Sequence, residues 1–135
     1  MAEVEISFDP DRIDFAATSQ LIRASYWGAK RSDDIHRRAF DNSLCVGAFM
    51  DGEQVGFARV ITDYACFAYL CDVIVWPERR GAGIGKKLIR ALLDHPDLAT
   101  VGGWSLRTAD AHSLYAGFGF EVSEDGKAML LRRSR

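Results

Sequence analysis

A basic stretch rich in glycine lies in the middle of the chain, directly after an apolar segment that ends before Pro77. Residues 79–90 contain five cations and no acid, and glycine occupies every second position from Gly81 to Gly85. Glycines allow the backbone to turn its N–H groups inward, and a helix N-terminus carries unpaired N–H groups with about half a positive charge. A basic run is usually a solvated helix face, but these glycines favour a cradle for a pyrophosphate group. Further cations at its rim would be Arg80, Lys86 and Lys87.

The glycine spacing argues against two common phosphate-binding loops. A dinucleotide-binding G-x-G-x-x-G loop would need a third glycine at position 86, which is a lysine. A Walker loop needs a second glycine five residues after the first, and neither Gly81 nor Gly83 has one. The ligand is therefore expected to be neither a dinucleotide nor the nucleotide of a kinase.

The elements that must position this stretch alternate between strands and helices. Apolar alternation, apolar runs and turn residues predict strands at 4–8, 44–50, 54–62, 66–75 and 104–107, and a terminal hairpin of 118–122 and 127–132. Capping residues and helical spacing predict helices that begin at Asp11 or Asp14, at Ser32, near 85 and near 109. The Asp51-Gly52 dipeptide supplies the positive φ angles of a tight hairpin. The order indicates an α/β fold with a mixed sheet and a local parallel pair.

Length, charge and composition exclude several classes of protein. The 135 residues predict one domain spanning residues 1–135. A net charge of −2 argues against a nucleic-acid binder. No apolar stretch approaches the ~20 residues of a membrane helix. The acidic N-terminus does not resemble a secretory signal. We therefore expect a cytoplasmic protein without a membrane partner. The three cysteines and three histidines lack metal-binding spacing, which predicts structural, buried thiols and no metal.

Two motifs together resemble those of the GNAT acyltransferase superfamily. Arg80-x-x-Gly83-x-Gly85, placed between a strand and an amphipathic helix, is similar to its coenzyme A loop, Q/R-x-x-G-x-G/A. Residues 111–120 resemble its A-x-x-L-Y-x-x-x-G-F helix and turn. The order of elements also resembles that of the GNAT fold over nearly the whole chain. The resemblance implies the order β-α-α-β-β-β-α-β-α-β-β, with a splayed parallel pair at strands 4 and 5.

The resemblance also implies a function and assigns roles to particular residues. It implies transfer of an acetyl group from acetyl-CoA to a primary amine of a small molecule or peptide, by direct attack in a ternary complex. Tyr115 would protonate the departing thiolate, which a phenol with a pKa of about 10 can do at neutral pH. Many relatives have asparagine where this chain has Thr108, which can still hydrogen-bond to the pantetheine arm. The backbones of Val73 and Val75 would pair with that arm. The pyrophosphate would lie against Arg80, Gly81, Ala82, Gly83, Ile84, Gly85 and Lys86.

The residues on the acceptor side carry weaker signals. Asp72 is the sole charge in an apolar strand, and a buried carboxylate with a raised pKa could act as the general base. It could equally pair with a neighbouring cation such as Arg59. Asp63 and Asp33 could attract a cationic amine, whereas Asp110 is more typical of a helix cap. Aromatic residues expected to wall the acceptor pocket are Tyr26, Trp27, Tyr64 and Tyr69.

Other functions stay open from the sequence. The chain could be a non-catalytic sensor that binds acyl-CoA, or a nucleic-acid module that uses the basic run. Two chains could also form a homodimer through the final strands. The identity of the acceptor amine does not follow from these residues.

Overall fold

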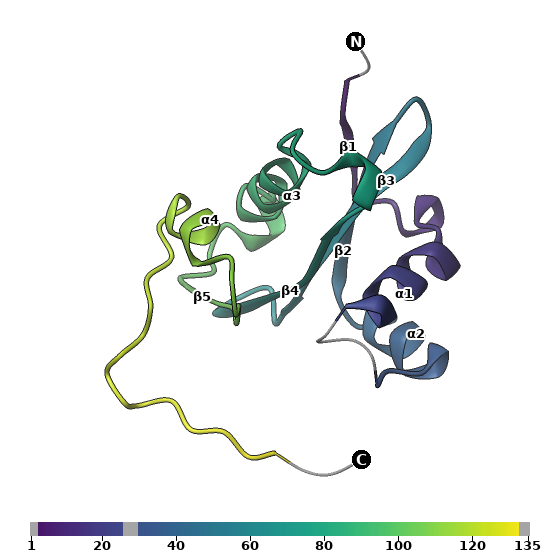
Figure 1. Ribbon diagram of the computed structural model, residues 1–135. Helices are drawn as coiled ribbons and strands as arrows, with labels where there is room; N and C mark the ends of the chain where they lie inside the picture. Colours follow the sequence, from purple (N-terminus) through teal and green to yellow (C-terminus); the bar gives the residue numbers. More distant parts are fainter. Residues whose placement is uncertain (1–2, 26–29, 133–135) are drawn as a thin grey trace.

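The computed structural model describes residues 3–25 and 30–132 of the chain. Its strands are β1 (Glu5–Ser7), β2 (Leu44–Met50), β3 (Glu53–Thr62), β4 (Phe67–Val75) and β5 (Gly103–Ser105). In the described residues these strands form one sheet in the order β1-β2-β3-β4-β5 (Figure 1). Neighbouring strands are antiparallel except for β4 and β5, which are parallel. The mixed sheet with a parallel pair at strands 4 and 5 is thus confirmed.

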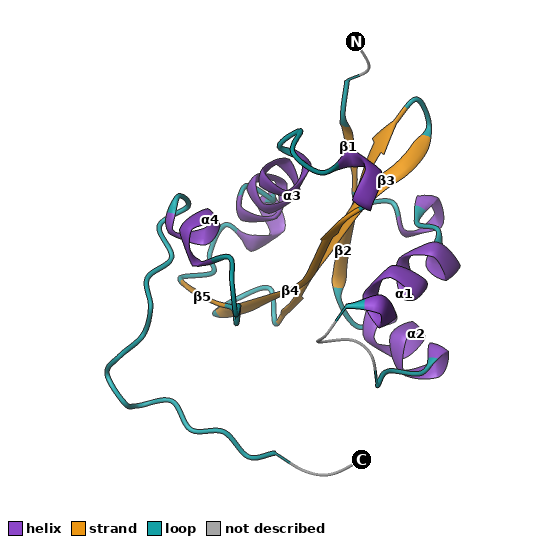
Figure 2. Ribbon diagram, viewed as in Figure 1, coloured by secondary structure: helices purple, strands orange, loops and turns teal. Residues whose placement is uncertain are grey.

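Helices lie on both sides of the sheet. They are α1 (Phe15–Ala24), α2 (Asp33–Asp41), α3 (Ile84–Leu93) and α4 (His112–Ala116). Helices α1 and α2 lie on one side, and α3 and α4 lie on the other (Figure 2). Within residues 3–25 and 30–132, no helix is both long enough and apolar enough to cross a membrane.

The expected starts of α1 and α2 and the expected hairpin turn are confirmed. The carboxylate of Asp14 accepts a hydrogen bond from the backbone N–H three residues later at 3.0 Å, and it thereby caps α1. The hydroxyl of Ser32 caps α2 in the same way at 3.2 Å. Between β2 and β3, Asp51 and Gly52 have φ angles of 51° and 80°. These features depend on residues close together in sequence, so local patterns suffice to predict them.

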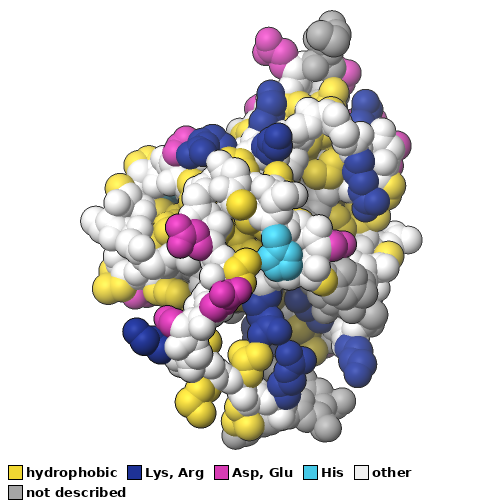
Figure 3. Space-filling model, turned by 60° about the vertical axis from the view of Figure 1, so that its left-hand side comes forward, with side chains coloured by type: hydrophobic (Ala, Val, Ile, Leu, Met, Phe, Trp, Pro, Cys, Tyr) yellow, Lys and Arg dark blue, Asp and Glu magenta, His cyan; other side chains and the backbone are white. Residues whose placement is uncertain are grey.

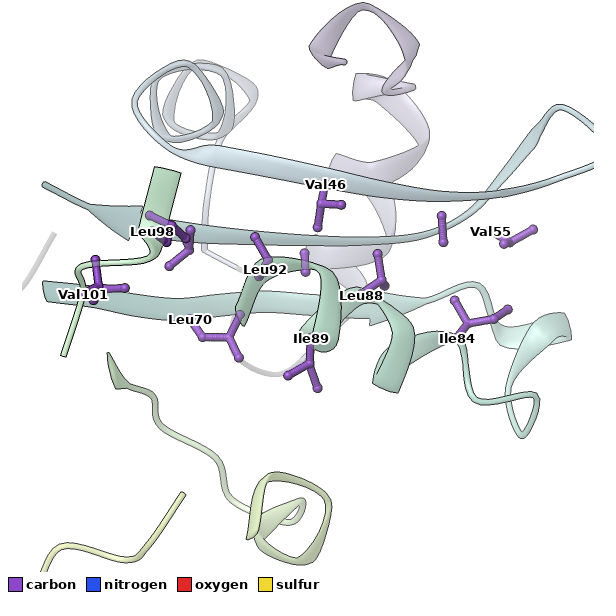
Figure 4. Close-up of a cluster of buried hydrophobic side chains, with 13 residues drawn as sticks. Val46, Val55, Leu70, Ile84, Leu88, Ile89, Leu92, Leu98 and Val101 are labelled. Atoms are coloured by element: carbon purple, nitrogen blue, oxygen red, sulfur yellow. The ribbon is translucent and has the colours of Figure 1, made fainter. Parts of the chain in front are cut away.

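The larger core lies between α3 and the sheet (Figure 4). Ile84, Leu88 and Leu92 lie at helical spacing and are buried, and each such side chain contributes about 1.5–3 kcal/mol. Gly56 of β3 permits the close approach, because a Cβ there would lie 3.0 Å from Cγ2 of Ile84 and 3.1 Å from Cδ1 of Leu88. This packing fixes the first turn of α3, and with it the glycine-rich loop, against the sheet.

Strand β4 continues beyond its pairing with β5. The parallel pairing runs from Phe67–Gly103 to Tyr69–Ser105, while β4 extends to Val75. In the described residues, no strand therefore pairs with this part of β4 on the β5 side. On the other side the register with β3 shifts opposite Asp72, whose φ of 53° marks a bulge in β4. The two parallel strands are thus splayed, as expected, and the bulge lies within the opened part of β4.

The expected terminal hairpin is wrong. Residues 118–132 contain no strand. From residue 120 on they run as an extended segment (yellow-green to yellow in Figure 1), which returns beside β3 and β4 at Leu130 and Arg132. The turn itself forms, because Gly126 has a φ of 68° and the Asp125 carboxylate accepts a hydrogen bond from the Lys127 N–H at 3.0 Å. The flanking residues have no ladder partner, and Met129 is 92% exposed. An apolar run becomes a strand only when it docks against a sheet edge, and residues 127–132 do not pair with the outer edge of β5.

Candidate active site

The glycine-rich loop leads into an uncapped helix N-terminus. Gly81 and Gly83 have φ angles of 88° and 76°, a conformation that strains other L residues. Gly83 is the N-cap of α3, and its carbonyl accepts the hydrogen bond from the N–H of Lys87 at 3.2 Å. No described side chain caps this end of α3. Its first-turn N–H groups therefore remain available to an anion, next to the exposed side chains of Arg80 and Lys86.

A hollow of about 970 Å³ lies between α3 and α4. Its lining includes three cations, Lys86, Lys87 and Arg90, and no acid. The guanidinium of Arg90 lies 4.9 Å from the ring centroid of Phe118, so α3 and the segment after α4 are in contact here. Lys86 and Lys87 are the cations expected at the rim of the pyrophosphate cradle, and Arg90 belongs to the same basic run. Their common cavity appears once the two helices are packed together.

A second cavity, of about 810 Å³, brings together residues from distant parts of the chain. Five of the predicted site residues line it. Four arginines line it as well, three of which the sequence analysis did not single out. The five are Tyr69, Asp72, Val73, Thr108 and Tyr115, and the arginines are Arg31, Arg59, Arg107 and Arg132.

Tyr115 is half-buried in α4 beside this cavity. Its ring meets the ring of Phe120 edge-on, with the centroids 6.0 Å apart. Burial raises the pKa of the phenol, and the charge of Asp110 raises it further. The phenol therefore stays protonated at neutral pH and can act as a proton donor.

Asp72 is buried at the bulge of β4 and is held by two arginines. Its Oδ2 accepts hydrogen bonds from Nε of Arg59 at 2.6 Å and from Nη1 of Arg31 at 2.8 Å. Burial raises the pKa of this carboxyl, but the two guanidinium groups outweigh burial and lower it. The raised pKa expected from sequence is thus wrong. The pairing with Arg59, which the sequence left open, is present, while the role of general base stays a prediction.

The start of α4 differs from expectation. The Thr108 hydroxyl accepts a hydrogen bond from the Ala111 N–H at 3.0 Å, and α4 has no other side-chain cap among the described residues. The predicted capping role of Asp110 is therefore wrong. Asp110 instead lines the cavity with Tyr115.

The other described residues that were predicted on the acceptor side do not line this cavity. Tyr64 is exposed in the turn between β3 and β4 and lines neither cavity. In the same turn the Asp63 carboxylate accepts three backbone N–H bonds, which lower its pKa. Asp33 pairs with Arg23. Tyr26 and Trp27 lie outside the described residues. Of the two predicted aromatics that the structure describes, Tyr69 lines the cavity and Tyr64 does not.

The cysteines differ in accessibility. Burial raises the pKa of Cys45 to about 12 and that of Cys71 to about 11, so both thiols stay protonated at neutral pH. Cys66 is exposed, so its expected burial is wrong. In the described residues, no group of three His, Cys, Asp or Glu side chains could hold a metal ion.

Known proteins are similar to this chain in amino-acid sequence. Residues 41–122, more than half of the chain, match the family model of the acetyltransferase (GNAT) domain. The chloroplastic GCN5-related N-acetyltransferase 2 of Arabidopsis thaliana is 39% identical over 88 residues, which are 56% of this chain and 32% of that protein. The chain spans between 32% and 60% of the lengths of the curated relatives it matches.

Solved structures agree over the whole chain. A protein of Xanthomonas campestris pv. campestris assigned to the GNAT family is 42% identical, with a TM-score of 0.93 over 99% of this chain and 95% of that one. Aminoglycoside N-acetyltransferase AAC(6')-Iy, solved in complex with CoA, has the same fold at 18% identity, with a TM-score of 0.73 over 100% of this chain and 97% of that one. The matching domain model and the fold agree with the two motifs, and the chain belongs to the GNAT acetyltransferase family.

Proposed function

We propose that the protein is an N-acetyltransferase that uses acetyl-CoA and acts on a primary amine. The observation that carries this proposal is the cavity at the opened part of β4, where Val73 and Tyr115 line one space. That space lies beyond the paired part of two parallel strands, and Val75, two residues further on, leads into the glycine-rich loop. The family and the CoA complex of a protein with the same fold support it.

The donor would bind along β4 and across the loop. Its pyrophosphate fits the uncapped N-terminus of α3, where the positive φ angles of Gly81 and Gly83 shape the loop and a Cβ on either glycine would meet nothing within 4 Å. Arg80 and Lys86 supply neutralising charge. The pantetheine arm would take the place of a strand beside Val73 and Val75, since peptide groups on that side of β4 have no described strand to pair with.

The reaction needs one proton donor and a free amine. The amine nitrogen attacks the thioester carbonyl carbon, the C–N bond forms, and the C–S bond breaks. The nitrogen loses one proton to solvent, and solvent returns a proton to Tyr115 after the reaction. Tyr115 would give its proton to the departing thiolate, and its raised pKa keeps that proton in place until charge develops on sulfur. Asp72 remains a candidate base, but its lowered pKa argues for a role in positioning Arg31 and Arg59.

Replacing Tyr115 by phenylalanine tests the proposal. We expect kcat to fall roughly ten- to a thousand-fold while the Kd of acetyl-CoA, measured by calorimetry, stays unchanged. Tyr64→Phe is the matched control, because Tyr64 loses the same hydroxyl at an exposed position outside both cavities. An unchanged kcat would remove Tyr115 from the mechanism. Binding of acetyl-CoA without thiol release across a broad amine panel would instead indicate a non-catalytic acyl-CoA sensor.

A further inference from the structure

The cavity beside Tyr115 is lined by more positive than negative side chains. Its arginines come from four separate segments, and the acids that line it are Asp72 and Asp110. On the face of the molecule that Figure 3 shows, Lys and Arg side chains lie over the upper part and also in the lower part. The arginines are Arg31 before α2, Arg59 in β3, Arg107 after β5 and Arg132 in the C-terminal segment.

Asp72 carries one negative charge, and two guanidinium groups share it. Its side chain is fully buried, that of Arg59 is 8% exposed, and that of Arg31 is 26% exposed. Arg31 is therefore the member of this cluster that reaches solvent. To described residues it donates through Nη1 alone, although a guanidinium has five N–H donors. Two guanidinium groups and one carboxylate leave the cluster with a net positive charge, and all three residues line the cavity.

The donor's phosphates do not account for these arginines. The cations expected to hold them are Arg80 and Lys86 at the N-terminus of α3, and Lys87 and Arg90 in the hollow between α3 and α4. None of these four lines the cavity beside Tyr115. An anion bound there would therefore belong to the acceptor.

We propose that the acceptor amine also carries a carboxylate, which Arg31 and Arg107 bind. This inference rests on the proposed function. A guanidinium binds a carboxylate through two parallel hydrogen bonds. A polycationic acceptor would be repelled by the surplus of arginines, and a simple alkylamine would offer no anionic group to Arg31 and Arg107.

The same charges favour the reactive form of the amine. Most alkylamines are protonated at neutral pH, and only the free amine can attack the thioester. Neighbouring cations lower the pKa of an amine, because they disfavour its charged form. Once the carboxylate has anchored the acceptor, the surplus of arginines therefore assists loss of the ammonium proton to water. Asp110, the other acid that lines the cavity, lies close enough to Tyr115 for its charge to raise the pKa of the phenol.

Matched acceptors test the inference. Phenylalanine, glutamate and β-alanine are compared with their carboxamides, with spermidine and with aminomethylphosphonate, and released CoA is measured. We expect kcat/KM to be roughly ten- to a hundred-fold higher for each amino acid than for its amide, as charge-assisted hydrogen bonds predict. A preference for the amides, for spermidine or for the phosphonate would overturn the inference.

Variants locate the binding group. Arg31→Gln and Arg107→Gln should each remove most of the discrimination between amino acids and their amides, while the Kd of acetyl-CoA stays the same. Arg31→Lys should restore part of it. Arg38→Gln, an exposed arginine of α2 that does not line the cavity, is the control. Discrimination that survives both glutamine variants, with unfolding curves like those of the unmodified protein, would overturn the assignment.

Product binding separates this inference from the proposed function. N-acetylphenylalanine should bind at least ten-fold tighter than its amide, and Arg31→Gln should abolish the difference. If no amine releases CoA but this binding difference is present, the proposed function fails and the carboxylate site stands. If amines react without discrimination and both products bind equally, the function stands and the carboxylate site fails.

Discussion

Replacing Asp72 by asparagine would leave the guanidinium of Arg59 in the interior without its counter-charge. The Asp72 side chain is fully buried and that of Arg59 is 8% exposed, with 2.6 Å between Oδ2 and Nε. Removing one partner of a buried ion pair costs about 3–5 kcal/mol. For 135 residues, an unfolding entropy of about 2.1 cal/mol/K per residue converts this cost into a fall in Tm of about 11–18 °C.

Scanning calorimetry and urea unfolding measure this change. Glu5→Gln is the matched control, since it removes one charge from the ion pair between Glu5 and Arg12, whose side chains are 61% and 33% exposed. A solvated pair of this kind contributes little. The double variant Asp72→Asn with Arg59→Leu should recover much of the loss, because the remaining unpaired buried charge is then gone. If Asp72→Asn lowered Tm no more than Glu5→Gln, the buried ion pair would not stabilise the fold.

Other predictions concern burial elsewhere in the fold. Burial lowers the pKa of His36 in the folded protein, so as pH falls the unfolded chain binds a proton at this histidine before the folded protein does. The free energy of unfolding should therefore decrease as pH falls below about 6.5. His36→Leu should flatten this dependence in unfolding curves measured from pH 7.5 to 5. In native protein a maleimide should label exposed Cys66 well before Cys45, whose pKa is about 12, and equal rates would contradict the burial. Gly56→Ala should destabilise by about 1–3 kcal/mol in urea unfolding, because its Cβ would meet Ile84 at 3.0 Å, whereas a neutral effect would mean that α3 shifts easily.

Sequence reasoning located the glycine-rich loop because every relevant feature is local. The positive φ angles at Gly81 and Gly83 and the start of α3 lie within a few residues of one another. The two GNAT motifs likewise consist of near neighbours along the chain. The acceptor side differs in this respect. Arg31 and Arg107 lie 76 positions apart, and no spacing indicates that they line one cavity.

The chain alone determined the order of its elements from β1 to α4, the caps of α1 and α2 and the hairpin turn at Asp51-Gly52, since hydrogen bonds and φ preferences over a few residues decide these features. Tertiary structure decided the ionisation of Asp72, because its pKa depends on two guanidinium groups that the fold brings from other elements. It also decided that the apolar residues 128–131 form no strand, because strand pairing depends on docking against a distant sheet edge, which the local pattern does not specify. Burial and charge act through space, and only the packed chain specifies which atoms are close.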